Sequence, residues 1–80
     1  MSIITRNAQQ LGNVIRTTRK EHGLTQAALA EKAGLRQATI SKIESGNGAT
    51  KIETVLTVIA MLGLDLSISE RQRRNIEDIL

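Results

Sequence analysis

The 80-residue chain contains no cysteine, no Phe, Trp or Tyr, and a single histidine, His22. Without cysteine it can form neither a disulfide nor a thiolate metal site, and one histidine cannot build a metal site alone. Without aromatic side chains it cannot stack single-stranded bases as RRM and OB-type domains do. No apolar run approaches the ~18 residues of a membrane span. We therefore expect a cytoplasmic protein that is neither inserted nor exported and needs no metal or cofactor.

Length and composition predict one small globular domain over residues 1–80. The chain is 40% hydrophobic and 24% charged, which is ordinary for a folded protein and argues against disorder. The core must be made of Ile, Leu, Val, Ala and Met. Since a core of this size supplies only about 3 to 5 kcal/mol, we expect oligomerisation to add stability.

Positive charge is concentrated in the first two thirds of the chain. Residues 1–51 hold eight Lys or Arg against three Glu, a net charge of +5, whereas residues 52–80 hold three Arg against five acids, a net charge of −2. This asymmetry favours a polyanion-binding front part and a different role for the back part, although scattered basic residues also occur on ordinary solvated surfaces.

Capping residues and apolar spacing predict three short helices in the front part. Asn7 with Gln10 matches an N-capping pattern, Thr25 can cap the second helix, and Gly23 and Gly34 are positioned to end the first two. The expected helices cover residues 8–21, 26–33 and 37–45.

The back part predicts a fourth helix followed by a strand. Thr50 with Glu53 forms a capping box before an almost uniformly apolar helix over residues 51–62. Residues 64–69 then alternate, which places Leu64, Leu66 and Ile68 on one face of a strand. That strand needs a partner, either residues 2–5 or its own copy across a two-fold axis, and we favour the symmetric dimer. A short polar helix is expected over residues 70–79.

Residues 25–46 carry the most specific pattern. Ala30 and Gly34, with apolar Leu35, Ile40 and Ile43, meet the requirements of two short helices joined by a tight turn. The segment TQAALAEKAGLRQATISKIESG resembles, without a gap, the Cro/CI-type (XRE) family, whose pattern is T-Q-x-x-L-A-x-x-x-G-(V/I/L)-x-x-x-x-(I/V)-S-x-(I/W)-E-x-G. The resemblance implies a mainly α, lambda-repressor-like helix-turn-helix bundle of four to five helices, with one C-terminal β-strand pairing across a homodimer.

Polar residues of this segment are candidates for contacts with double-stranded DNA. In helix-turn-helix proteins the second helix enters the major groove, and the N-terminus of the first helix lies at a phosphate. Base contacts are therefore expected from Arg36, Gln37, Ala38 and Ser41. Phosphate contacts are expected from Gln26, Thr39 and Lys42. Arg16, Arg19 and Lys20 either extend the phosphate contacts or form a simple solvated face.

The chain as a whole resembles one branch of this family, the HipB-type antitoxins. The resemblance is carried by QATIS at residues 37–41, by the apolar helix and by GLDLSI at residues 63–68. It implies a bacterial, nucleoid-associated repressor that pairs its strand between protomers, represses its own operon and binds a HipA-type serine/threonine kinase toxin. It divides the domain into a helix-turn-helix over about 25–45, a dimerisation helix and strand over about 51–69 and a C-terminal helix or tail over 70–80.

Two other classes remain open. One is a stand-alone phage or plasmid repressor, or a restriction-modification controller, with only DNA and its own copy as partners. The other is an enzyme, for which the sequence offers no converging acid, base and nucleophile; His22 beside Gly23 fits a capping or surface residue better. We therefore expect no enzymatic activity.

Overall fold

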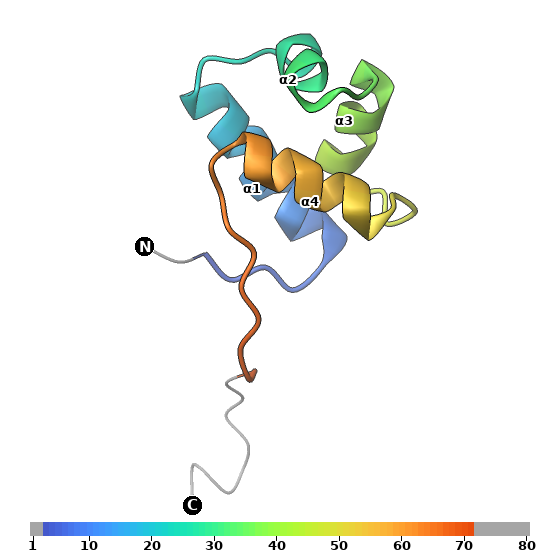
Figure 1. Cartoon of the computed structure of the whole chain (residues 1–80). Helices are drawn as coiled ribbons and strands as arrows, with labels where there is room; N and C mark the ends of the chain where they lie inside the picture. Colours follow the sequence, from blue (N-terminus) through green and yellow to red (C-terminus); the bar gives the residue numbers. More distant parts are fainter. Residues whose placement is uncertain (1–2, 72–80) are drawn as a thin grey trace, which may run out of the picture.

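Four helices lie within the part of the chain that the structure describes (Figure 1). The computed structural model describes residues 3–71, and in that range α1 covers Ala8–Glu21, α2 Gln26–Ala33, α3 Gln37–Glu44 and α4 Ile52–Met61. The first two helices have the expected bounds, α3 ends one residue earlier, and α4 is one residue shorter at each end. None of these helices is long and apolar enough to cross a membrane.

The start of α1 is fixed by local hydrogen bonds. The Asn7 side chain accepts a hydrogen bond from the Gln10 backbone N–H at 2.8 Å, which confirms Asn7 as the N-cap. The return bond differs from a standard capping box, because the Gln10 side chain accepts from the backbone N–H of Arg6 at 2.7 Å and not from that of Asn7. Two polar side chains thus satisfy backbone donors at the start of α1.

The predicted capping box at the start of α4 is wrong. Lys51, and not Thr50, occupies the N-cap, and no side chain hydrogen-bonds there. The helix begins at Ile52, so Glu53 lies one position too early to complete the box. The burial of Val55 and Val58 in the core fixes this helix, and tertiary packing therefore overrides the local capping signal.

The core lies where all four helices meet. α3 packs against α1 and α2, and α4 packs against α2. The buried apolar residues are aliphatic throughout, as the composition requires: Ile15, Leu29, Ala30, Ile40, Ile43, Val55, Val58, Ile59 and Leu62. Because burial of each of the larger side chains contributes about 1.5–3 kcal/mol, the short helices owe most of their stability to these contacts.

The chain after α4 leaves the bundle as an extended segment (Figure 1). Leu64 is anchored through a hydrogen bond from its backbone N–H to the Ile59 carbonyl at 3.0 Å, and residues 65–71 are exposed. Within residues 3–71 no strand forms, so the described part of residues 2–5 does not pair with residues 64–69. A single chain does not test pairing across a two-fold axis, which stays a prediction. Most of the expected helix over residues 70–79 lies outside the described residues; Glu70 and Arg71, which are described, are not helical.

Candidate nucleic-acid interface

The α2–turn–α3 unit has the geometry of a helix-turn-helix. Gly34 adopts a left-handed conformation (φ 69°, ψ 33°), which a residue with a side chain adopts at an energetic cost. The Leu35 N–H then donates to the Ala30 carbonyl at 2.8 Å and closes the turn. Leu29, Ala30 and Ile40 are buried between the two helices, so the angle of α3 relative to α2 is set by the core.

The structure places the polar candidates of α3 together on one exposed surface. Ile40 and Ile43 point inward, while the intervening positions remain accessible to a ligand. Among the candidates on this surface, Thr39 is half-buried and the others are exposed: Arg36, Gln37, Ala38, Ser41 and Lys42. We call these six residues the α3 face.

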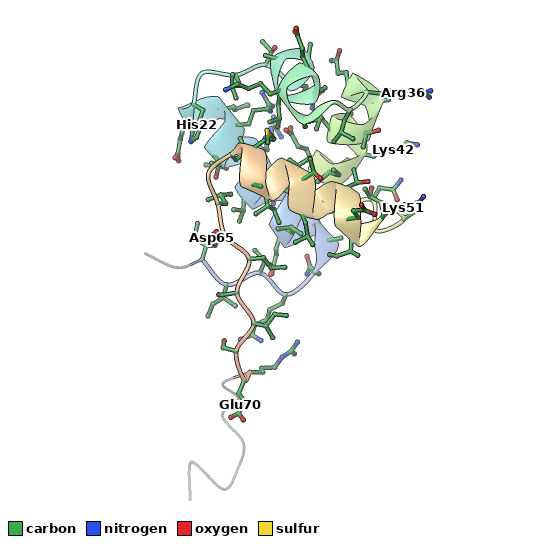
Figure 2. The ribbon with its side chains drawn as sticks, viewed as in Figure 1. His22, Arg36, Lys42, Lys51, Asp65 and Glu70 are labelled. Carbon is green, nitrogen blue, oxygen red and sulfur yellow. The ribbon has the colours of Figure 1, made fainter. Side chains whose placement is uncertain are left out.

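Basic side chains point outward on the same side of the molecule as the α3 face. Figure 2 shows Arg36, Lys42 and Lys51 pointing outward on the same side, with Lys51 in the loop that leads into α4. Asp65 and Glu70 lie on the extended segment, away from α3. Three basic side chains therefore lie on the side of the molecule that carries α3, which favours the approach of a polyanion.

Gln26 has an internal contact that the sequence did not reveal. It is the first residue of α2, directly after Thr25, whose side chain caps the helix by accepting from the Ala28 N–H at 3.0 Å. The Gln26 side chain is half-buried, and its Nε2 donates to Glu44 Oε1 at 3.1 Å. One of its two amide N–H groups is thus engaged inside the protein.

Arg19 does not belong to an exposed phosphate-binding row. Its side chain is only 9% exposed, and its Nε and Nη2 donate to Glu44 Oε2 and Oε1 at 2.6 and 3.0 Å. Its Nη1 donates to the Leu24 carbonyl at 2.8 Å. The structure therefore corrects the hypothesis that groups Arg19 with Arg16 and Lys20, which are exposed.

The carboxylate of Glu44 is held in its charged form. Burial acts to raise the pKa of Glu44, but hydrogen bonds from Arg19 and Gln26 and the positive charges of Arg19 and Arg16 outweigh it and lower that pKa. The same hydrogen bond raises the pKa of Arg19 against the opposing effect of burial. Both groups are therefore ionised at neutral pH, and none of the described buried side-chain N or O atoms lacks a partner.

Sequence reasoning missed two structural positions behind this site. Glu44 is an acid at the end of the helix proposed to meet DNA, an unfavourable position for a charge that is not paired. Gly12 lies inside α1 at helical spacing from Ile15 and Arg19, and a glycine inside a helix costs about 1 kcal/mol relative to alanine. The reason here is the close approach of α1 to the carbonyls of Ile43 and Glu44. Both signals were present in the sequence.

The predicted dimerisation residues follow α4, on the segment that leaves the bundle (Figure 1). Leu64 is half-buried against the core, whereas Leu66 and Ile68 are 51% and 94% exposed. Three apolar side chains of α4 are exposed as well: Ile52, Leu56 and Met61. Leu66 and Ile68 lie on the extended segment and not on α3, whereas Ile52 directly follows Lys51 at the start of α4.

A shallow groove of about 470 Å³ lies between α1 and the end of α4. Apolar Ile3, Val14, Leu62 and Leu64 line it together with polar residues of α1 and His22. Of the residues that line this groove, His22 and Glu21 are the ones of a type that commonly binds metal ions. No group of His, Cys, Asp or Glu that could hold a metal ion occurs among residues 3–71.

Comparison with known proteins agrees with this geometry. The helix-turn-helix family HTH_3 matches residues 15–68. The antitoxin HipB of Escherichia coli strain K12 is 32% identical over 68 residues, which make up 85% of this chain and 77% of the relative.

Two solved structures share the fold over nearly the whole chain. A complex of a HipB variant with an O2 20mer has a TM-score of 0.83 at 30% identity, covering 90% of this chain and 100% of that one. A HipA–HipB–O2–O3 complex has a TM-score of 0.82 at 30% identity, covering 89% and 100%. The chain therefore belongs to the helix-turn-helix family of DNA-binding domains and, within it, to the HipB-type antitoxins.

Proposed function

We propose that the chain is a sequence-specific repressor that reads double-stranded DNA with α3. The observation that carries this proposal is the α3 face, a polar and basic surface on a helix whose other side is locked into the core. An exposed eight-residue helix fits the major groove, where base edges present distinct patterns of donors and acceptors. The folding of α3 does not require this exposed polar surface.

Roles within the α3 face follow from chemistry and position. Gln37, the first residue of α3, can donate and accept with an adenine, and Ala38 can contact a thymine methyl. Arg36 and Ser41 reach the same groove, whereas Thr39 and Lys42 contact phosphate or flanking bases. Each good bidentate base contact discriminates by about 1–3 kcal/mol.

The proposed DNA-binding unit is a homodimer. A single module of this size buries too little DNA for tight specific binding, whereas a two-fold dimer presents two copies of α3 about 34 Å apart to successive major-groove turns. Exposed Leu66 and Ile68, on the segment with strand-like alternation, support pairing of residues 64–69 between protomers, with Leu64 on the same face.

We further propose that the chain is the antitoxin of a toxin–antitoxin module, which represses its own operon and binds a HipA-type serine/threonine kinase. Support comes from the relative named antitoxin HipB and from the HipA–HipB–O2–O3 structure, which this chain resembles over 89% of its length. The alternative is a stand-alone repressor or restriction-modification controller. Such a protein has the same α3 face but no toxin.

Binding-site selection from random duplex DNA, followed by titration at several salt concentrations, tests the DNA-binding proposal. Gln37→Ala should change which sequence is preferred. Lys42→Ala should weaken binding to all sequences alike and lower the salt slope by about one unit per contact. Arg71→Ala removes the same charge beside Glu70, which Figure 2 shows on the extended segment away from α3, and should leave the slope unchanged. If Gln37→Ala leaves specificity untouched, α3 is not the reading helix.

A tagged pull-down from the native host separates the antitoxin from the stand-alone repressor. A kinase-like protein that co-purifies near stoichiometry supports the antitoxin proposal. Recovery of DNA without a protein partner, in cells that express the neighbouring genes, supports the alternative.

A further inference from the structure

A buried carboxylate connects three helices behind the α3 face. Glu44 is the last residue of α3 and its side chain is only 4% exposed. Its Oε1 accepts from both Arg19 Nη2 of α1 and Gln26 Nε2 of α2, at 3.0 and 3.1 Å, and its Oε2 accepts from Arg19 Nε. The first residue of α2 is thereby joined to the last residue of α3.

Arg19 makes this acid compatible with a DNA-binding surface. An unpaired carboxylate at the end of α3 would repel phosphates and would be costly to bury. The bidentate guanidinium neutralises it, and the third bond of Arg19, to the Leu24 carbonyl, ties the pair to the segment just before α2. The pair has no net charge, so it adds nothing to the attraction of DNA.

The consequence for Gln26 is a fixed amide. A free glutamine side chain has up to about 2 kcal/mol of rotamer entropy to lose when it is ordered. Because the amide is planar, the bond from one Nε2 hydrogen to Glu44 limits the directions open to the other. The Glu44 carboxylate therefore already orders part of the Gln26 side chain in the free protein. Less side-chain entropy is then lost when DNA binds.

We propose that Glu44 is a positioning residue for Gln26: its carboxylate, neutralised by Arg19, holds the Gln26 amide so that the second Nε2–H meets a DNA phosphate. This inference rests on the proposed function and goes beyond it. Gln26 touches DNA, Glu44 acts only through Gln26, and Arg19 acts through Glu44. The acid at the end of α3 thus serves DNA binding without contacting DNA.

A double-mutant cycle tests this coupling. The paired change Arg19→Met with Glu44→Leu removes both charges together, and apolar replacement of a buried ion pair is often neutral or stabilising. In the native background Gln26→Ala should weaken DNA binding about 10-fold or more, as expected for a hydrogen bond to a charged group. In the paired background the same change should weaken binding by less than about 3-fold, because Gln26 has already lost its acceptor.

Salt dependence separates positioning from direct contact. Gln26 is neutral and the Arg19–Glu44 pair has no net charge, so none of these changes should alter the salt slope. A slope lower by about one unit in the paired variant would mean that Arg19 itself binds phosphate, and would overturn the assignment.

The wild-type protein provides a measurement that does not depend on the variants folding. In NMR spectra one of the two Gln26 side-chain amide protons should be protected from exchange with water, and addition of the selected DNA should shift this pair. Gln9, which is exposed, is the internal control. A Gln26 amide that exchanges as fast as that of Gln9, or an equal loss from Gln26→Ala in both backgrounds, would refute the positioning role. Failure of the wild-type protein to select any DNA sequence would instead refute the proposed function.

Discussion

Replacement of Gly12 by alanine tests a close approach between α1 and the end of α3. A Cβ at Gly12 would lie 2.8 Å from the Glu44 carbonyl oxygen and even closer to that of Ile43, and both are backbone atoms that cannot rotate away. Adding a methyl group to a packed site typically costs about 1–3 kcal/mol. Alanine also gains about 1 kcal/mol over glycine in a helix.

The two effects oppose each other, and the clash should win. Since the obstructing atoms are backbone, we expect a cost at the upper end of the range and a net loss of about 1–2 kcal/mol in the free energy of unfolding. For a domain of this size each 1 kcal/mol corresponds to about 4–8 °C in Tm. Urea denaturation at one fixed protein concentration measures the loss, because dimerisation would make stability depend on concentration.

Gly48→Ala is the matched control. Nothing lies within 4 Å of a Cβ built there, and its φ is outside the left-handed region. This change should be neutral or should stabilise by about 0.4–1 kcal/mol. If Gly12→Ala proves as stable as the native protein, the contact of α1 with the end of α3 is looser than this geometry requires, and the predicted clash is refuted.

Two further predictions concern acid sensitivity and assembly. The folded-state pKa of Glu44 is lowered, so its contribution to stability is complete above the unfolded-state value of about 4.3 and is lost as the pH falls from there through the folded-state pKa. Between pH 6 and pH 3 the urea midpoint of the native protein should therefore fall more than that of the Arg19→Met, Glu44→Leu variant. Equal decreases in the two proteins would contradict a stabilising role of the Glu44 carboxylate. Leu66→Asp should yield monomers in sedimentation, while Ser67→Asp, with the same charge on the opposite face, should not; a Leu66→Asp dimer would reject strand pairing.

Local signals determined the helices and the motif. Asn7 and Thr25 cap α1 and α2 as the sequence predicts, because a cap bonds to backbone groups only three residues away. Gly34 ends α2 for an equally local reason, since the turn needs a left-handed residue. The arrangement of the α3 face follows from the 3.6-residue period of the helix.

Contacts between residues far apart in the sequence were decided by the tertiary structure alone. Arg19 and Glu44 are separated by 25 positions, and only the packing of α1 against α3 brings them to 2.6 Å and buries Arg19, which the sequence left open as a phosphate contact or a solvated residue. The same packing explains Gly12, whose role depends on a carbonyl from another helix. α4 begins one residue later than the predicted capping box requires, for a related reason. Burial of its apolar side outweighs a cap hydrogen bond of about 1 kcal/mol. Sequence patterns within a few residues thus located the elements and the proposed reading surface, whereas the network behind that surface depends on distances that exist only after folding.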